Sequence, residues 1–342
     1  MKNQIYLLTH ILLIIGLMNL SWAQKSFKSE TEEISTVAGG YANDGKFHGG
    51  ILIAHQGKVL FELASGVNTA SEENTLDSHF ELCSLGKMFT GMLIAHLVHE
   101  GKLAYEDKFT SYLPSYECHP LQQEISIHHL LTHSSGIPDI YSQDFIKKVV
   151  NHQKISVEEY FNHYAQDPNS TVFFASEKPS FKSGKRFSYS NSGYLLLGLV
   201  IEEVTGLTYA QAIEKHILEP FNMSETQIGS AYGGGKSTMR DMLKFQQGLH
   251  KHTLLDELTL SEVTQPSVKN GKDFYYGYGF EIDLAHPLKV VSHKGGNATT
   301  KVEFMFTPQA NSMGIIYANN PSKGYSEFHQ QRQMLRIQLG RQ

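Results

Sequence analysis

The stretch at residues 81–103, ELCSLGKMFTGMLIAHLVHEGKL, constrains the fold more than any other part of the sequence. It has the spacing of a helix, and apolar residues occupy nearly its whole circumference, so it belongs inside a protein. A serine and a lysine, Ser84 and Lys87, nevertheless stand one turn apart at its start. Because a buried lysine is costly unless it is paired or has lost its proton, this pair indicates a functional site.

The spacing of Ser84 and Lys87 suits an activated nucleophile. Positions i and i+3 share one face of a helix, and apolar surroundings lower the pKa of a lysine. A hydroxyl is a weak nucleophile until a nearby base takes its proton, and a neutral lysine is such a base. The competing interpretation is a capping serine followed by a surface lysine. Because the helix is apolar nearly all round, we favour the catalytic interpretation of the pair.

The composition sets bounds on the molecule. The chain has 342 residues, of which 40% are hydrophobic and 18% charged, enough for one large domain or two smaller ones. The formal net charge of −5 provides no basic surface, and we predict no nucleic-acid partner.

Residues 1–23 resemble a targeting segment. A positive start is followed by an apolar run, which His10 interrupts, and by Ser-Trp-Ala. This pattern predicts a signal peptide cleaved after Ala23, and therefore a periplasmic or secreted protein with no stable membrane span. The alternative is a single membrane anchor. Export permits a bridge between Cys83 and Cys118, although Cys83 also suits packing as a small hydrophobe.

The order of patterns along the chain predicts an α+β fold. Alternating strand-like segments lie near both ends, at 50–62 and at 276–320, and helical spacing dominates the middle. The economical packing is one antiparallel sheet, flanked by helices, with an all-helical lobe inserted. We predict a single catalytic domain over residues 24–342, with a sheet lobe at about 30–80 and 230–342 and a helical lobe at about 81–229. The active site is expected in the cleft between the lobes.

Two further stretches supply groups for catalysis. FSYSNSGYLLLG places Tyr189 and Asn191 on a loop before a helix, where a tyrosine can shuttle a proton. VSHKGGNATT is a strand end with two glycines, where a backbone N–H can face a developing oxyanion. His293 or Lys294 is a candidate to meet a substrate carboxylate there, but on a strand the two point to opposite faces.

Three motifs in this order resemble the serine β-lactamase-like superfamily, which includes class C β-lactamases, D-alanyl-D-alanine carboxypeptidases and related esterases. They are SLGK at 84–87, YSN at 189–191 and HKG at 293–295. The segments LLTHSSGIPD, GYLLLGLVIEEVTG, EPFNMSET and STMRDMLKF are also similar to the family, and the resemblance covers about residues 35–340. It implies a β-lactamase/transpeptidase-like fold.

The resemblance also implies a mechanism. Ser84 attacks a carbonyl, and Lys87 and Tyr189 move the proton, in either order. Asn191 orients the substrate amide or Lys87. The backbone N–H groups of Ser84 and Gly296 form the oxyanion hole, and Gly295 and His293 complete the substrate-binding strand. Water then hydrolyses the acyl-enzyme, without metal or other cofactor.

Two features depart from the β-lactamase pattern. His293 replaces the lysine of a Lys-Thr-Gly motif, and a largely neutral histidine holds a carboxylate less firmly. This favours the peptidases and esterases of the family. NATTKVEF stands where relatives carry a Gly-Phe pair, so we expect a reshaped cleft wall.

The sequence therefore predicts an exported serine hydrolase acting on a small-molecule, peptide or ester substrate, with peptidoglycan peptides the nearest candidates. One alternative is a penicillin-recognising sensor or binding module with little turnover. Another is a metal-dependent hydrolase that uses His128, His129 and His133, because histidines at i and i+4 can bind zinc.

Overall fold

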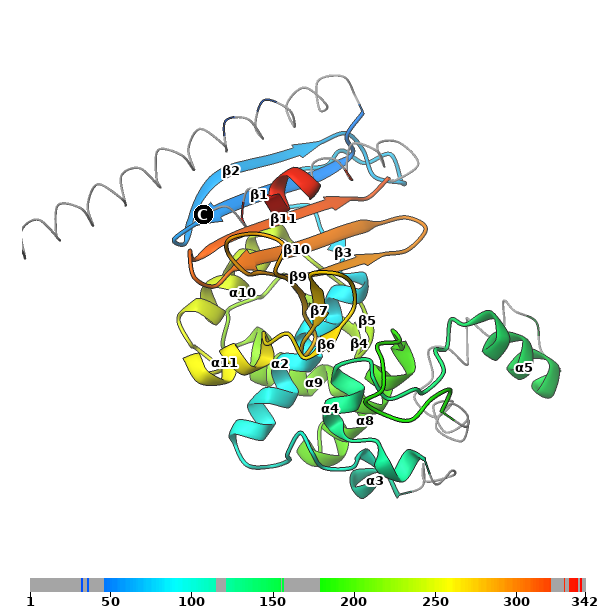
Figure 1. Ribbon diagram of the computed structural model, residues 1–342. Helices are drawn as coiled ribbons and strands as arrows, with labels where there is room; N and C mark the ends of the chain where they lie inside the picture. The colour runs from blue at the N-terminus through cyan, green and yellow to red at the C-terminus, as the bar shows by residue number, and fades with distance from the viewer. Residues whose placement is uncertain are drawn as a thin grey trace, which may run out of the picture.

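The largest element of the computed structural model is an antiparallel sheet built from both ends of the described chain (Figure 1). The structure describes residues 46–114, 121–154, 179–320 and 332–337, together with residues 32, 36, 156, 329 and 339. The predicted signal peptide and Cys118 lie outside the described residues. The strand order is β2-β1-β11-β10-β9-β8-β7-β6. The strands are β1 (Gly49–His55), β2 (Lys58–Ser65), β6 (Val268–Lys269), β7 (Phe274–Tyr276), β8 (Glu281–Asp283), β9 (Val290–Gly296), β10 (Lys301–Thr307) and β11 (Ser312–Ala318).

Two strand pairings join the N-terminal strands to the rest of this sheet. β1 and β2 form the predicted hairpin, whose turn at Gln56 and Gly57 has positive φ at both residues. β1 then pairs with β11, from Gly49 opposite Ala318 to His55 opposite Ser312. The first and last described strands are thus neighbours, and the predicted α+β architecture of an antiparallel sheet with flanking helices is confirmed.

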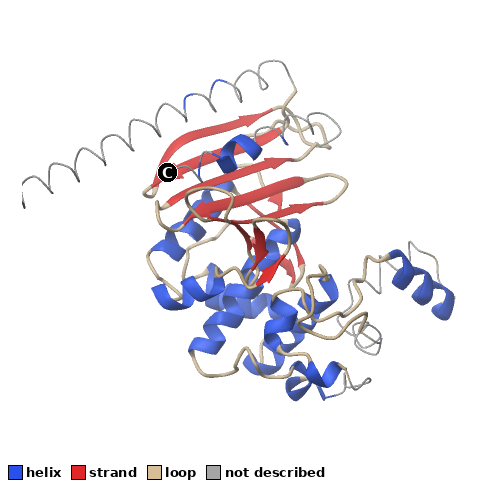
Figure 2. Ribbon diagram, viewed as in Figure 1, coloured by secondary structure: helices blue, strands red, loops and turns tan. Residues whose placement is uncertain are grey.

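Most of the helices lie on one side of the sheet, and the C-terminal helical segment lies against the other (Figure 2). The central one, α2 (Gly86–His99), is buried continuously from Gly86 to Ala95, as its apolar circumference predicts. It follows the 3-10 turn η1 (Cys83–Leu85) directly. The remaining helices are α3 (Phe109–Tyr112), η3 (Gln122–Glu124), α4 (Ile127–Leu131), α5 (Gln143–Gln153), α8 (Asn191–Thr205), α9 (Tyr209–Ile213), η6 (Glu214–Leu218), α10 (Met239–His250) and α11 (Glu257–Val263).

Apolar side chains cover both faces of the sheet. A large core joins the inner face to α2, α8 and α10 through residues such as Leu52, Phe304 and Phe245. A smaller core on the outer face includes Ile51 and Leu335, so the C-terminal helical segment 332–337 packs there. Among the described residues no single helix is long and apolar enough to span a membrane, and one bent pair, α8 with α9–η6, passes on length and composition alone.

A second, three-stranded sheet was not predicted. Its order is β3 (Phe80–Glu81), β5 (Gly233–Ser237) and β4 (Gln227–Ser230). It joins the segment just before η1 to the middle of the chain, across the predicted boundary between the lobes. Its position matters because β5 lies against the start of α2, where Ser84 is found.

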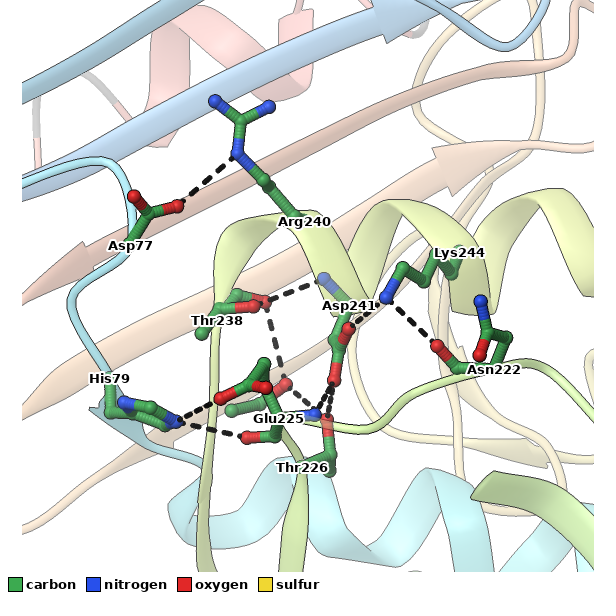
Figure 3. A network of polar contacts seen from close by, with 10 residues as sticks. Asp77, His79, Asn222, Glu225, Thr226, Thr238, Arg240, Asp241 and Lys244 are labelled. Atoms are coloured by element: carbon green, nitrogen blue, oxygen red, sulfur yellow. Dashed lines mark hydrogen bonds and ion pairs between the residues drawn. The ribbon is translucent and has the colours of Figure 1, made fainter. Parts of the chain in front are cut away.

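A polar network anchors the segment that leads into β3 (Figure 3). Thr238 caps α10, and the buried carboxylate of Asp241 accepts hydrogen bonds from the Glu225 amide at 2.8 Å and from Lys244 at 2.7 Å. His79 Nε2 lies 3.1 Å from the Glu225 carbonyl oxygen. The network therefore ties α10 to the residue immediately before β3, and so to the approach to η1.

Candidate active site

Ser84 and Lys87 come together at the junction of η1 and α2. The Lys87 side chain is completely buried, and its Nζ lies 3.4 Å from Ser84 Oγ. The residue before the serine, Cys83, has a φ of 47°, a left-handed backbone conformation that residues other than glycine rarely adopt. The chain therefore turns sharply at Cys83, directly ahead of the residue that bears the hydroxyl.

Lys87 is held by two oxygen acceptors. Its amine donates to Asn191 Oδ1 at 2.8 Å and to the carbonyl oxygen of Tyr232. Burial lowers the pKa of Lys87 to about 7, although the nearby carboxylate of Asp139 acts in the opposite direction. A substantial fraction of this amine is therefore neutral near neutral pH, as a general base requires.

Tyr189 lies across from both groups. The Ser84 side chain is near enough to the Tyr189 hydroxyl to act on the pKa of that group, and the centre of the tyrosine ring lies 4.8 Å from Lys87 Nζ. Burial raises the pKa of the Tyr189 hydroxyl well above its usual range. The phenol therefore keeps its proton at neutral pH, which suits a donor better than a base.

Asp139 is a site residue to which the sequence analysis assigned no role. Its carboxylate accepts hydrogen bonds from the backbone N–H of Asn191 at 3.0 Å and from Asn191 Nδ2 at 3.1 Å. These bonds leave Asn191 Oδ1 directed at Lys87, so the chain Asp139–Asn191–Lys87 fixes the orientation of the amine. The segment LLTHSSGIPD was recognised only as similar to the family, and this aspartate is its last residue.

The three histidines of the HHLLTH segment have separate partners. His128 Nδ1 bonds to the Tyr278 hydroxyl at 2.8 Å, and His129 Nδ1 accepts from the Ser126 amide at 3.1 Å. His133 is buried behind Tyr189, with ring centres 4.2 Å apart, and its Nδ1 accepts from the Ser190 amide. Within the described ranges, no group of three His, Cys, Asp or Glu side chains is arranged to hold a metal ion.

The end of β9 packs against Ser84. A Cβ added at Gly295 would lie 2.9 Å from the Ser84 backbone nitrogen and 2.9 Å from the Leu82 carbonyl oxygen. Only glycine fits this approach without displacement of the strand. The Ser84 backbone nitrogen and Gly296, the last residue of β9, therefore lie on adjoining segments, as an oxyanion hole made from their two amides requires.

His293, predicted to be a largely neutral substrate-binding residue, is a neutral ring with both nitrogens hydrogen-bonded. Its ring is buried, Nδ1 donates to the Lys294 carbonyl oxygen at 2.8 Å, and Nε2 accepts from the Tyr276 hydroxyl at 2.8 Å. Burial lowers the pKa of His293 to about 3, so the ring is neutral. His293 lines the cavity as a neutral group, so it supplies no positive charge for a substrate carboxylate.

Sequence reasoning also missed the glycine run that begins at Gly233. A Cβ there would lie 2.3 Å from the Cys83 carbonyl oxygen, and one at Gly86 would lie 2.7 Å from Gly233 Cα. The preceding residue, Tyr232, supplies the carbonyl oxygen that holds Lys87. Three consecutive glycines at 233–235 were the available signal, and all three have positive φ.

These groups surround a cavity of about 580 Å³. Its lining brings together the serine, the tyrosine and the third-motif strand with charged residues from β8, β10 and the C-terminal segment, among them Ser84, Tyr189, Glu281, His293, Lys294, Gly295, Gly296, Lys301 and Arg332. Ser84 and Tyr189 line this cavity, and the buried amine of Lys87 lies 3.4 Å from the serine oxygen, an arrangement suited to acyl transfer.

Comparison with known proteins agrees with this geometry. The family model described as Beta-lactamase matches residues 34–337. The chain belongs to this family of serine β-lactamase-like hydrolases, and the resemblance drawn from its three motifs is confirmed.

Three members show the extent of the likeness. Penicillin-binding protein 4* of Bacillus subtilis is 28% identical over 298 residues, which are 73% of this chain and 63% of that protein. Protein flp of Staphylococcus aureus strain MW2 is 32% identical over 181 residues, 52% of this chain and 34% of flp. The crystal structure of a penicillin-binding protein from Bacillus halodurans superimposes with a TM-score of 0.74 at 25% identity, covering 88% of this chain and 98% of that one. This chain thus spans less than two thirds of the two curated relatives.

Proposed function

We propose that the protein hydrolyses a peptide, amide or ester through an acyl intermediate on Ser84. The observation that carries the proposal is the buried Lys87 amine, whose pKa is lowered to about 7 and whose Nζ lies 3.4 Å from the serine oxygen. A surface lysine would be protonated and could not accept the serine proton. The arrangement therefore supports catalysis rather than helix capping.

The acylation step follows from the two pKa directions. Neutral Lys87 takes the proton of Ser84 Oγ as that oxygen attacks the substrate carbonyl carbon. Tyr189, still protonated, gives its proton to the leaving group and is reprotonated by the Lys87 ammonium. The backbone N–H groups of Ser84 and Gly296 stabilise the negative oxygen of the tetrahedral intermediate. Water then attacks the acyl-serine, and the same groups return the proton to Ser84 Oγ.

We further propose that this hydrolase is exported, on the pattern of residues 1–23, and that peptidoglycan peptides are the nearest natural substrates. What supports the proposal is the likeness to a protein named as penicillin-binding, together with the predicted export. His293 stands where β-lactamases have the lysine of a Lys-Thr-Gly motif. A neutral histidine at this position favours a peptidase or esterase over a β-lactamase.

Intact-mass spectrometry tests the proposal. A fluorophosphonate should add one adduct, located at Ser84, and Ser84→Ala should abolish it, whereas Ser261→Ala, at an exposed serine of α11, should not. Labelling that survives Ser84→Ala would refute the nucleophile.

Turnover rates, measured beside the mass of the adduct, separate the substrate classes. We expect p-nitrophenyl acetate or a D-Ala-D-Ala peptide to be turned over faster than nitrocefin. An acyl adduct that forms and persists without product release would instead support the penicillin-recognising sensor.

A further inference from the structure

The cavity at Ser84 has an excess of positive charge. Among the residues that the structure describes, three cationic side chains line it, Lys294 from β9, Lys301 from β10 and Arg332 from the C-terminal segment, against one lining carboxylate, that of Glu281. The neutral His293 adds nothing to this charge. A ligand with a negative group is therefore favoured over a neutral one of the same shape.

Two of the three cations already have carboxylate partners. Lys294 Nζ lies 3.1 Å from Glu281 Oε1, and Arg332 pairs with Glu303 at 3.0 Å. Lys301 has no carboxylate within 4.0 Å among the described residues, and its Nζ donates to the Asn297 carbonyl oxygen at 3.0 Å. Two of the three protons on that amine remain for a ligand.

A rigid turn holds Lys301 in place. Asn297 Oδ1 accepts hydrogen bonds from the amides of Thr299 and Thr300, both at 2.8 Å, and the Asn297 amide donates to the Thr300 carbonyl oxygen at 2.9 Å. This turn is the NATT segment, at which the sequence predicts a reshaped cleft wall. Lys301 follows it directly and pairs with Gly296 across β9 and β10.

The amine lies against the Gly296 backbone, on the strand face opposite to the one on which Gly295 meets Ser84. A Cβ added at Gly296 would come within 3.0 Å of Lys301 Nζ. Lys301 also acts electrostatically on the thiol of Cys83, the neighbour of Ser84. A substrate acyl group that reaches past Gly296 therefore meets this ammonium.

Lys301 lies beside Gly296, the last residue of β9, whereas a chain of aromatic contacts joins the proton donor to the middle of that strand. Tyr189 stacks on His133, which contacts Tyr276 at 4.6 Å between ring centres, and Tyr276 bonds to His293 near the middle of the strand. The leaving group must lie near Tyr189 to receive its proton. Lys301, beyond Gly296, therefore faces the acyl part that stays on Ser84.

We propose that Lys301 forms an anion subsite for the acyl side of the substrate, so that the preferred acyl donors carry a carboxylate on the group transferred to Ser84. This inference rests on the proposed acyl-serine chemistry and names its substrate class. Lys301 is then a specificity-determining residue at the start of β10, directly after the NATT turn.

Matched esters test the inference. The substrates are p-nitrophenyl monoesters of dicarboxylic acids with three to five methylenes, each compared with its ω-methyl ester, so that only the charge on the acyl group changes. We expect kcat/KM to favour the free acid by about 5- to 10-fold, on the scale of one partly exposed charge-assisted hydrogen bond. The ratio within each variant is compared, so a general loss of activity cancels.

Variants then assign the preference. Lys301→Met should bring the ratio to about one, Lys301→Arg should retain it, and Lys301→Glu should reverse it, whereas Lys58→Met, at an exposed lysine of β2, should leave it as in the native protein. As a further control, esters with a carboxylate only on the leaving group should show no dependence on residue 301.

The outcomes separate the two proposals. Equal rates on the acid and its methyl ester, with Ser84 acylated by both, would overturn the subsite and leave the acyl-serine chemistry intact. A preference that persists in Lys301→Met would also overturn it. If no ester acylates Ser84, the proposed function fails, and the subsite fails with it.

Discussion

At the scale of single residues, Lys87 shows how burial and pairing act against each other on one amine. Desolvation lowers its pKa, the charge of Asp139 raises it, and the result lies near neutrality. Asp139 and many of the residues that bury Lys87 are distant from it in the sequence. The Ser-x-x-Lys spacing therefore identifies the pair, but it does not predict the pKa of the lysine.

The rate should depend on pH through this amine. Because only neutral Lys87 accepts the serine proton, kcat/KM should fall about tenfold per pH unit below a pKa of about 7 and level off above it. Lys87→Ala should lose at least about 10²-fold in rate. Lys102→Ala, at an exposed lysine just beyond the end of α2, is the matched control, and a flat profile across this range would argue against lysine as the base.

Asp139→Asn changes the charge but preserves an acceptor for Asn191. Since the carboxylate raises the pKa of Lys87, its removal should move the acidic limb of the profile to lower pH. Asp139→Ala should in addition lower kcat, because Asn191 loses the hydrogen bonds that orient it. Asp144→Asn, at an exposed site, serves as the control. Unshifted profiles in both Asp139 variants would limit this residue to a structural role.

At the scale of elements, the active site depends on close contact between η1, β5 and β9. Glycines make both contacts possible, Gly233 on one side and Gly295 on the other. Ser84 is then within reach of Lys87 from α2 and of Tyr189 from the loop before α8.

A methyl group at Gly295 should separate β9 from η1. Its Cβ would lie 2.8 Å from the Cys83 Cβ, 2.9 Å from the Leu82 carbonyl oxygen and 2.9 Å from the Ser84 nitrogen, and none of these atoms can move aside without the backbone. We expect Gly295→Ala to lose about 10²-fold or more in kcat, the scale for loss of an oxyanion donor, while circular dichroism shows a folded chain. Gly193→Ala in α8, whose Cβ would be 3.6 Å from its nearest neighbour, should keep near-native rates.

The sequence predicted elements better than their contacts. The hairpin, the buried helix and the strands β9 to β11 follow from periodicity, which depends on residues close in the chain. The segment 276–283 was expected to be one strand, but it is split between β7 and β8 by a turn with Gly279 at φ 84°. The small sheet was missed because β5 is rich in glycine and has little apolar alternation.

In the active site, too, the side chains that belong to motifs were predicted and their tertiary contacts were not. Ser84, Lys87, Tyr189 and Asn191 were predicted from motifs and lie together. The Tyr232 carbonyl oxygen could not be predicted, because any residue type can provide a backbone acceptor. Likewise, only the tertiary structure shows that both nitrogens of His293 are occupied.

At the scale of the whole molecule, buried ion pairs attach the C-terminal segment to the outer face of the sheet. Arg336 donates to Asp283 on β8 and to Ser292 on β9, each at 3.0 Å, and to Glu303 on β10. All four side chains are buried. One guanidinium therefore links three strands.

Removal of that guanidinium should be costly. Arg336→Met leaves Asp283 and Glu303 buried with less compensation, and we expect the free energy of unfolding in urea to fall by about 3–5 kcal/mol. Arg240→Met, at an arginine whose side chain is 49% exposed, should change it by no more than about 1 kcal/mol. Equal losses in the two variants would contradict this assignment.

The pairing of β1 with β11 has a consequence for biosynthesis. Residues 49–55 find their partners only at 312–318, so the hairpin leaves the ribosome long before the strand it must join. Contacts this remote slow folding and leave an unfilled strand edge on the nascent chain. Polypeptides that stop short of β11 should therefore accumulate as inactive, chaperone-dependent species, and hydrolytic competence should arise only as the last strands are translated.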